Sequence, residues 1–213
     1  MQKYELIYAD CPWKYRVWNK KDNTRCAISH YPVMSISELC DLPIESIAAS
    51  DCTLFMWVTF PLLPEAFTVL ESWSFKYRTI AFVWVKRNKK TPSLFWGMGN
   101  WTRANAEICL LATKGKPKRI SASVHQIIES PIEEHSRKPN ITRHRIVELM
   151  GDVPRIELFA RQATSGWHTW GNEIQNDITL LDNEMENKNL PVQLSIEDIP
   201  TEQNFSSDNN YYP

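Results

Sequence analysis

The residues best suited to do chemistry are Asp10, Cys11, Pro12 and Trp13, at the end of an apolar segment that begins at Glu5. A carboxylate can accept a hydrogen bond from an exocyclic amine, and a backbone carbonyl in a proline turn can accept a second. An exposed indole can stack on a purine ring, a contact worth about 1–3 kcal/mol. Together these groups could hold the amino group of an adenine and align its nitrogen for attack. Taken alone, the four residues fit equally well a strand-ending Asp with a core Trp.

The chain around this motif alternates between apolar strands and helices. The predicted strands cover residues 5–10, 52–59, 79–86, 107–113, 123–128 and 155–161, and the predicted helices begin near 35, 64 and 139. Ser35 and Glu38 form the capping-box pattern that opens the first helix. Apolar strands separated by helices predict an α/β fold with a mostly parallel sheet and helices on both faces. Ligands collect at the carboxyl ends of such strands, which draws attention to Asp10, Lys86, Lys114 and Arg161.

The composition is that of a soluble globular chain with one domain and a tail. Of 213 residues, 43% are hydrophobic and 23% are charged, and the six glycines form neither a GxGxxG nor a GxxxxGK[ST] loop. The five scattered cysteines contain no CxxC pair, which favours a reducing compartment and argues against a zinc site. The five histidines are not spaced as ligands, so we expect no metal. The sequence also predicts neither a secretory signal nor a membrane span.

The near-neutral net charge of −1 hides two segments of opposite sign. Residues 174–213 carry eight acids and one base, so the other 173 residues hold 23 of the 24 bases and 17 of the 25 acids. We therefore expect a folded, mildly basic body over residues 1–175 and an acidic, disordered tail over residues 176–213. A basic body is compatible with a nucleic-acid partner.

Several segments together make the sequence resemble the MT-A70 family, the N6-adenine methyltransferases named after the seventy-kilodalton subunit of the mRNA adenosine methyltransferase. The segments are YADCPW (8–13), YPVMSISEL (31–39), LFMWVT (54–59), FVWVKRN (82–88), FWGMGNWTRANAEICLLATKG (95–115), EHSRKP (134–139), RIELFAR (155–161) and GWHTWGNE (166–173). The family motif is Asp-Pro-Pro-Trp. This chain has Cys11 at the second position and keeps Asp10, Pro12 and Trp13.

The resemblance implies a Rossmann-like class I methyltransferase fold of permuted order, with the catalytic motif near the N-terminus. It also implies methyl transfer from S-adenosylmethionine to the N6 amine of adenine. The catalytic residues would be Asp10, Pro12 and Trp13. The cofactor-binding residues would be Asp10, Lys138, Arg161, Asn172 and Glu173. Residues 162–164 depart from the Pro-His-Asn of the eukaryotic catalytic subunit, so cofactor contacts there do not carry over.

The substrate-binding residues implied in the same way are Trp13, Tyr15, Lys86, Asn105 and Glu107. Loops over residues 14–30 and 130–139 would gate the site. A phosphate-facing rim would comprise Lys86, Arg87, Lys89, Lys90, Lys114, Lys116, Lys118 and Arg119.

The compact form of the chain resembles phage and bacterial members of the family, which favours DNA as the substrate and the cytoplasm as the location. Two alternatives remain open: an RNA adenosine methyltransferase, and a non-catalytic nucleic-acid-binding subunit. A homodimer or a partner subunit is compatible with either.

Overall fold

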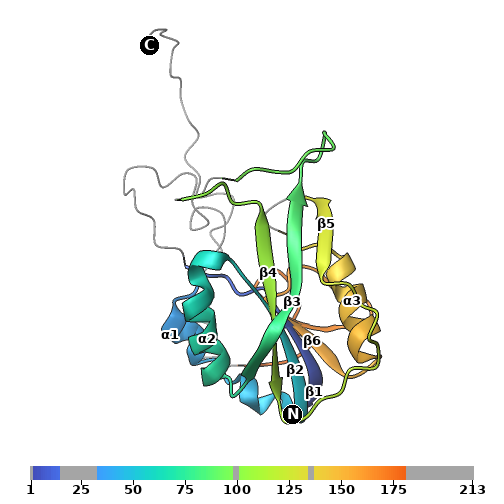
Figure 1. Ribbon diagram of the computed structural model, residues 1–213. Helices are drawn as coiled ribbons and strands as arrows, with labels where there is room; N and C mark the ends of the chain where they lie inside the picture. The colour runs from blue at the N-terminus through green and yellow to red at the C-terminus, as the bar shows by residue number, and fades with distance from the viewer. Residues whose placement is uncertain (1, 15–32, 98–100, 134–136, 181–213) are drawn as a thin grey trace, which may run out of the picture.

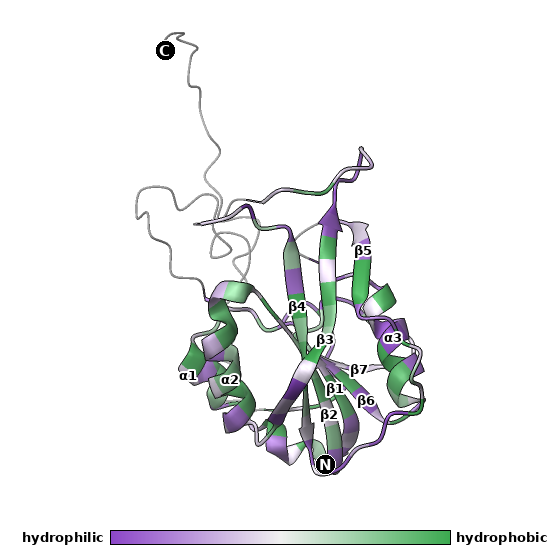
Figure 2. Ribbon diagram, viewed as in Figure 1, coloured by the Kyte–Doolittle hydropathy of each residue, from purple (hydrophilic) through white to green (hydrophobic). Residues whose placement is uncertain are grey.

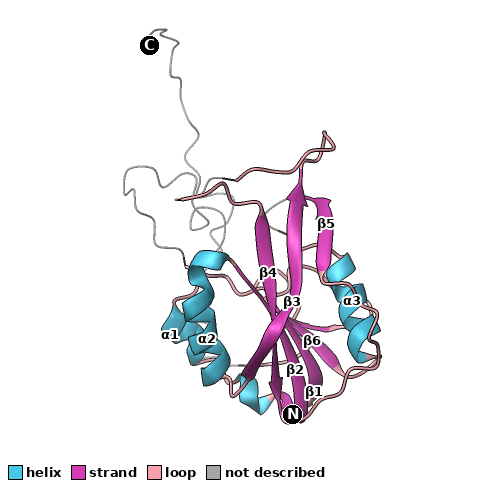
Figure 3. Ribbon diagram, viewed as in Figure 1, coloured by secondary structure: helices cyan, strands magenta, loops and turns pink. Residues whose placement is uncertain are grey.

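The computed structural model describes residues 2–14, 33–97, 101–133 and 137–180. These residues form a seven-stranded sheet with α1 and α2 on one face and α3 on the other (Figures 1 and 3). The strands are β1 (Tyr4–Ala9), β2 (Ala48–Val58), β3 (Lys76–Arg87), β4 (Ala106–Lys114), β5 (Ile127–Pro131), β6 (Arg155–Leu158) and β7 (His168–Trp170). The helices are α1 (Ile36–Cys40), α2 (Leu63–Ser72) and α3 (Ile141–Met150), with short 3₁₀ turns η3 (Ile44–Ser46) and η4 (Phe60–Leu62). Within the described ranges, no helix has the length and apolar character needed to cross a membrane.

The sheet order is β5-β3-β4-β2-β1-β6-β7, and every strand except β4 runs in one direction. The predicted α/β class, with a mostly parallel sheet and helices on both faces, is therefore confirmed. The reversal of β4 is the feature that its apolar sequence did not reveal. Because β4 is antiparallel to β2 and β3, its first residues lie at the edge of the sheet where the other strands end.

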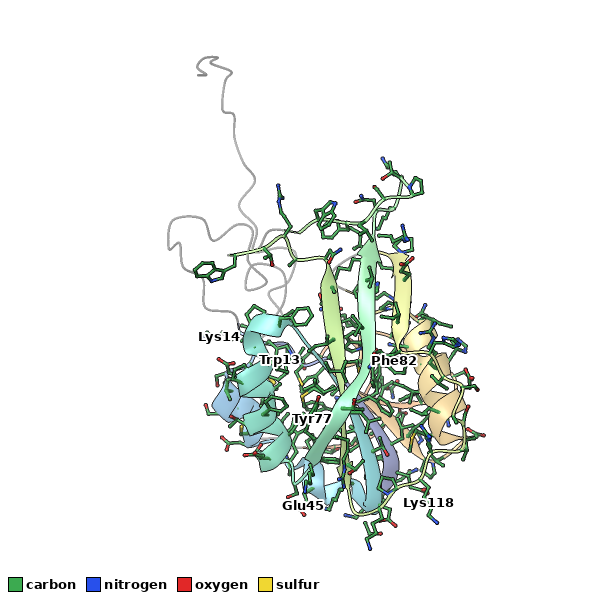
Figure 4. The ribbon with its side chains drawn as sticks, in the orientation of Figure 1. Trp13, Lys14, Glu45, Tyr77, Phe82 and Lys118 are labelled. Atoms are coloured by element: carbon green, nitrogen blue, oxygen red, sulfur yellow. The ribbon has the colours of Figure 1, made fainter. Side chains whose placement is uncertain are left out.

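This reversal corrects the prediction that Lys114 lies at the ligand-binding edge. Lys114 pairs in register with Cys52, in the first half of β2, and its Nζ donates to Oε1 of Glu45 at 3.0 Å. Figure 4 shows Glu45 and Lys118 at the end of the molecule away from Trp13. The predicted basic rim is therefore split between opposite edges of the sheet, and only its 86–90 part lies at the carboxyl edge.

Two predicted strands differ clearly from the structure in extent. The strand predicted over 155–161 ends at Leu158, and the short β7 that follows was missed. The strand predicted over 123–128 begins at Ile127. The α1 capping box is confirmed, since the Ser35 amide donates to Glu38 Oε2 at 2.6 Å and the Glu38 amide to Ser35 Oγ at 3.3 Å.

The core consists of two apolar layers, one on each face of the sheet. Alternate side chains of β1 and β2 point to opposite faces, so Ile7 and Met56 pack in the layer with α2, while Tyr8 and Trp57 pack in the layer with α3. Figure 2 shows the hydrophobic central strands between the helices. Burial on both faces explains why these strands are continuously apolar rather than alternating.

The residues after β7 fold back onto the body. The Asp177 carboxylate accepts from the amide and hydroxyl of Thr169 at 2.8 and 3.0 Å, and the Asn176 side chain accepts from the Gly171 amide at 2.7 Å. Leu180 is 5% exposed and belongs to the core. The first residues of the segment assigned to the acidic tail therefore lie against the body. The division after residue 175 stays a prediction.

Truncation tests where the stable unit ends. We expect a chain of residues 1–180 to unfold at a higher temperature than a chain of residues 1–175, because only the longer one retains Leu180 and the Asp177 hydrogen bonds. Burying a leucine alone contributes about 1.5–3 kcal/mol. Thermal unfolding followed by circular dichroism measures the difference. Equal melting temperatures would show that residues 176–180 do not stabilise the body.

Candidate active site

A pocket opens where β1, β2 and β6 end. Its walls come from segments far apart in the sequence, which the parallel strands bring to one edge. Its lining residues are Asp10, Cys11, Pro12, Trp13, Trp57, Val58, Thr59, Glu107, Lys138, Phe159, Ala160, Arg161, Asn172 and Glu173. All of the implied catalytic and cofactor-binding residues are among them. Of the implied substrate-binding residues, Trp13 and Glu107 line it.

The Lys138 ammonium lies at the centre of the charges in this pocket. Its Nζ is 2.8 Å from Oδ1 and 2.9 Å from Oδ2 of Asp10, and 3.3 Å from Oε2 of Glu107. The Lys138 side chain is only 8% exposed, and burial alone would lower its pKa. The carboxylates of Asp10 and Glu107 outweigh burial and raise the pKa of Lys138 above its ordinary value. Lys138 is therefore a permanent cation in the pocket.

Glu107 extends this network to a second lysine. Its Oε1 accepts from Nζ of Lys86 at 2.5 Å, and the same ammonium lies 5.0 Å from the ring centroid of Trp84. Burial alone would raise the pKa of Glu107, but Lys138 and Lys86 hold it below its ordinary value of 4.5. Two anions and two cations therefore alternate across the site from Asp10 to Lys86. This pairing makes their burial tolerable.

Trp13 lies in the pocket wall, and the prediction of an exposed indole is wrong. The side chain is 5% exposed, belongs to the core and donates its indole N–H to the Trp57 carbonyl at 3.0 Å. The Pro12 carbonyl accepts from the Met34 amide at 2.9 Å, and a carbonyl oxygen has a second lone pair for another donor. The turn is thus fixed by hydrogen bonds, and stacking of Trp13 on a substrate ring stays a prediction.

The outer end of the pocket is formed by the residues that follow β6 and β7. Nε of Arg161 is 3.7 Å from Oε1 of Glu173, and both side chains are partly exposed. Phe159, at the end of β6, has a φ of +60°, a strained value for a bulky residue. Gly171 is required here, because a Cβ would lie 2.2 Å from the Ala160 carbonyl oxygen. Strain and close approach at one place are typical of functional sites.

The remaining implied residues lie elsewhere. Lys86 and Asn105 are outside the lining of this pocket in the described chain, joined by a hydrogen bond from the Lys86 amide to the Asn105 carbonyl at 2.9 Å. Tyr15 and all of the first proposed gating loop except Lys14 lie outside the described residues, as do residues 134–136 of the second. Among the residues that are described, no group of three or more His, Cys, Asp or Glu side chains could hold a metal ion.

Several residues that build the site or pack near it carry no signal in the local sequence. Val58, Thr59, Phe159 and Ala160 line the pocket without chemically distinctive side chains, so only strand ends could have indicated them. On the α3 side of the sheet, the Arg143 guanidinium donates from Nε to Oε2 of Glu157 at 2.6 Å and lies 5.4 Å from the centroid of the Tyr8 ring. This buried pair joins α3 to β6.

The chemical reactivity of Cys11 is set by its surroundings. Burial and the neighbouring Asp10 raise the pKa of the Cys11 thiol well above its ordinary value. The thiol therefore stays protonated at neutral pH, which makes it a poor nucleophile.

The mostly parallel sheet, with the Asp-Cys-Pro-Trp turn in a pocket at its carboxyl edge, makes this an α/β protein consistent with the MT-A70 methyltransferase fold. The MT-A70 family model matches residues 4–173, and the chain belongs to this family.

Curated relatives agree with this membership. The chain is 34% identical to the Type II methyltransferase M.MunI of a Mycoplasma species, over 83% of this chain and 80% of that protein. It is 30% identical to an N(6)-adenosine-methyltransferase MT-A70-like protein of Arabidopsis thaliana, over 84% of this chain and 24% of that protein. It is 28% identical to the N6-methyladenosine RNA methyltransferase MTA1 of Pyricularia oryzae, over 80% of this chain and 47% of that protein. The chain therefore spans most of the first relative and less than half of the other two.

Replacing Glu107 tests the buried network. We expect Glu107→Gln to lower the free energy of unfolding by about 3 kcal/mol or more, because Lys138 loses a buried counterion. The contribution of the Glu107 carboxylate is fully present above pH 4.5 and is lost as the pH falls through its lower folded pKa. The difference between wild type and variant should therefore be constant near neutral pH and shrink in acid.

Urea unfolding between pH 3 and pH 7 measures this difference. Glu129→Gln is the matched control, since Glu129 pairs with Arg87 at a half-exposed site where an ion pair contributes about 0–1 kcal/mol. Equal losses of unfolding free energy in the two variants would show that the Glu107 ion pairs stabilise the fold no more than an exposed ion pair does.

Proposed function

We propose that this chain transfers a methyl group from S-adenosylmethionine to the N6 amine of adenine in DNA. The chain is a methyltransferase of the MT-A70 family. The observation that carries the proposal is the Asp10 carboxylate, which stands at the end of β1 in the pocket with both oxygens within 2.9 Å of Lys138. That contact holds the carboxylate in the pocket, which supports its proposed role as the acceptor for the substrate amine.

The catalytic difficulty is that the adenine amine is a poor nucleophile, because its lone pair is delocalised into the ring. A hydrogen bond from the amine to Asp10, and a second to the Pro12 carbonyl, favour a pyramidal nitrogen with its lone pair directed at the methyl donor. Positioning and preorganised charge of this kind supply most of the rate gain in such reactions. Asp10 needs little basicity, because the amine proton becomes acidic only as the N–C bond forms.

The residues of the outer pocket suit a nucleoside with free hydroxyls. The Glu173 carboxylate can accept from ribose hydroxyls, and Arg161 and Asn172 add donors. Val58 and Phe159 supply apolar surface for the uncharged part of the cofactor. When bound, S-adenosylmethionine supplies an electrophilic methyl group on a positively charged sulfur. The contact of Lys138 with the methionyl part belongs to this proposal, in addition to its pairing with Asp10.

DNA is the favoured substrate, and RNA is the second candidate. The match over 80% of the length of M.MunI supports the first, since the two chains are of similar extent. The relatives named as RNA methyltransferases support the second, but this chain spans only about half of the MTA1 proteins. A non-catalytic subunit is disfavoured, because Asp10 is intact and held in the pocket.

The cellular setting follows from the same proposal. The described cysteines Cys11, Cys40, Cys52 and Cys109 are all free thiols, which supports a reducing compartment such as the cytoplasm of a bacterial or phage-infected cell. A second copy of the chain or a partner subunit would add to the DNA-contacting surface.

Replacing the carboxylate oxygen of Asp10 tests the proposal. We expect Asp10→Asn to reduce methyl transfer to DNA by at least about 100-fold, because an amide presents one acceptor and no charge to the amine. The assay incubates protein, labelled S-adenosylmethionine and matched DNA and RNA oligonucleotides, and then identifies methylated nucleosides by mass spectrometry.

Asp152→Asn is the control, since Asp152 is an exposed carboxylate that pairs with Arg155 away from the pocket. Wild-type rates in Asp10→Asn, or N6-methyladenine in RNA alone, would overturn the proposal.

A further inference from the structure

The connection between β3 and β4 exposes aromatic side chains that contribute to neither core layer. Trp101 is 99% exposed and Trp96 is 57% exposed. Exposing an indole to water forgoes the burial that usually stabilises this residue, so Trp101 adds almost nothing to the stability of the fold and Trp96 adds less than a core tryptophan would. We call the described residues 88–97 and 101–105 the aromatic arm. Figure 1 shows this connection beyond the end of the sheet at which β3 ends.

The aromatic arm is built onto the sheet by backbone hydrogen bonds. The Phe95 amide donates to the Lys86 carbonyl at 2.9 Å, and the Gly97 amide donates to the Ala104 carbonyl at 2.7 Å. A Cβ on Gly97 would lie 2.7 Å from that same Ala104 oxygen, so this close pairing requires glycine. The two limbs of the arm are therefore paired, with one tryptophan near the pairing on each limb. Lys86, to which the first limb is joined, also contacts Glu107 in the pocket.

The charges of this region identify the kind of partner. Residues 86–105 contain Lys86, Arg87, Lys89, Lys90 and Arg103 and no acidic residue. Basic side chains interleaved with exposed aromatic rings suit a chain of phosphates and bases. A protein partner would require a matching acidic surface with apolar pockets, whereas nucleic acid combines both features in every nucleotide.

The position of the catalytic carboxylate supplies the reason for such an arm. Asp10 lies inside the pocket, so an adenine in a duplex must leave the base stack before its amine can reach the carboxylate. That step leaves the neighbouring bases without a stacking partner on one side. An aromatic side chain carried from the same edge of the sheet as the pocket can replace the lost contact.

We propose that the aromatic arm binds the DNA strand that carries the target adenine, with Trp101 and Trp96 stacking on its neighbouring bases and Lys89, Lys90 and Arg103 contacting phosphates. This inference rests on the proposed function, since it takes the substrate to be the same DNA. In this proposal the arm contacts the DNA on either side of the target base, whereas the pocket contacts only the target base itself.

DNA binding without turnover tests the arm. The probe is a fluorescent duplex oligonucleotide with a single adenine mismatch, titrated with protein in the presence of sinefungin, a non-reactive analogue of the cofactor, and followed by anisotropy. Trp101→Ala should weaken binding by about 5- to 150-fold, which corresponds to the loss of one base–aromatic contact. Trp101→Phe should recover most of this loss because it keeps an aromatic ring.

The controls use an aromatic and a basic residue far from the arm. Tyr77→Leu removes an aromatic ring from the start of β3, and Lys118→Ala removes a cation from the opposite edge of the sheet (Figure 4). Both should bind DNA within about twofold of wild type. Lys89→Ala combined with Lys90→Ala should weaken binding and lower its dependence on salt concentration.

The outcomes separate the arm from the proposed catalytic function. If Trp101→Ala binds DNA as tightly as Tyr77→Leu does, the proposal that the arm binds DNA is wrong, even if the wild type methylates DNA. The proposal is also wrong if Trp101→Ala changes the oligomeric state without changing the DNA affinity, since the arm would then contact protein. Tryptophan-dependent DNA binding by a wild-type chain that methylates no adenine would support the arm and refute the catalytic proposal.

Discussion

The ion pair between Lys138 and Asp10 is the contact on which the site depends. A carboxylate at the end of a buried strand is stable only if a cation or several donors compensate for its lost hydration. Lys138 provides that compensation from the segment just before α3, and Glu107 and Lys86 balance the charge on its other side. Because each member neutralises the next, the proposed catalytic carboxylate is held in one place.

The reversal of β4 makes this arrangement possible. In an all-parallel sheet, residue 107 would lie at the amino edge, far from Asp10. Because β4 runs the other way, Glu107 begins its strand where β1 and β3 end, within reach of Lys138 and Lys86. The same reversal places the β3–β4 connection at the pocket side of the molecule. One change of strand direction therefore creates both the second half of the charge network and the base of the aromatic arm.

The sequence predicted the sheet class, the strand that ends in Asp10 and most residues of the pocket. The sheet class could be predicted because buried strands leave long apolar runs. The family resemblance marks Lys138, Arg161, Asn172 and Glu173 by local motifs, and these residues line the pocket, while their roles stay predictions. The direction of β4 could not be predicted, since a strand buried on both faces has the same pattern in either direction. The burial of Trp13 was missed for a related reason, because its partner Trp57 lies 44 residues away. The Arg143–Glu157 pair was equally invisible to local patterns.

A kinetic comparison at Lys138 tests the central claim most directly, because it separates positioning of Asp10 from cofactor binding. The experiment measures the single-turnover rate of DNA methylation and the Kd for S-adenosylmethionine in wild type, Lys138→Gln and the surface control Lys118→Gln. If Lys138 positions Asp10, its variant should react about 100-fold more slowly even when the cofactor is saturating, since small misplacements carry penalties of that size. A wild-type rate at saturating cofactor, with only the Kd increased, would contradict the account and make Lys138 a cofactor ligand alone.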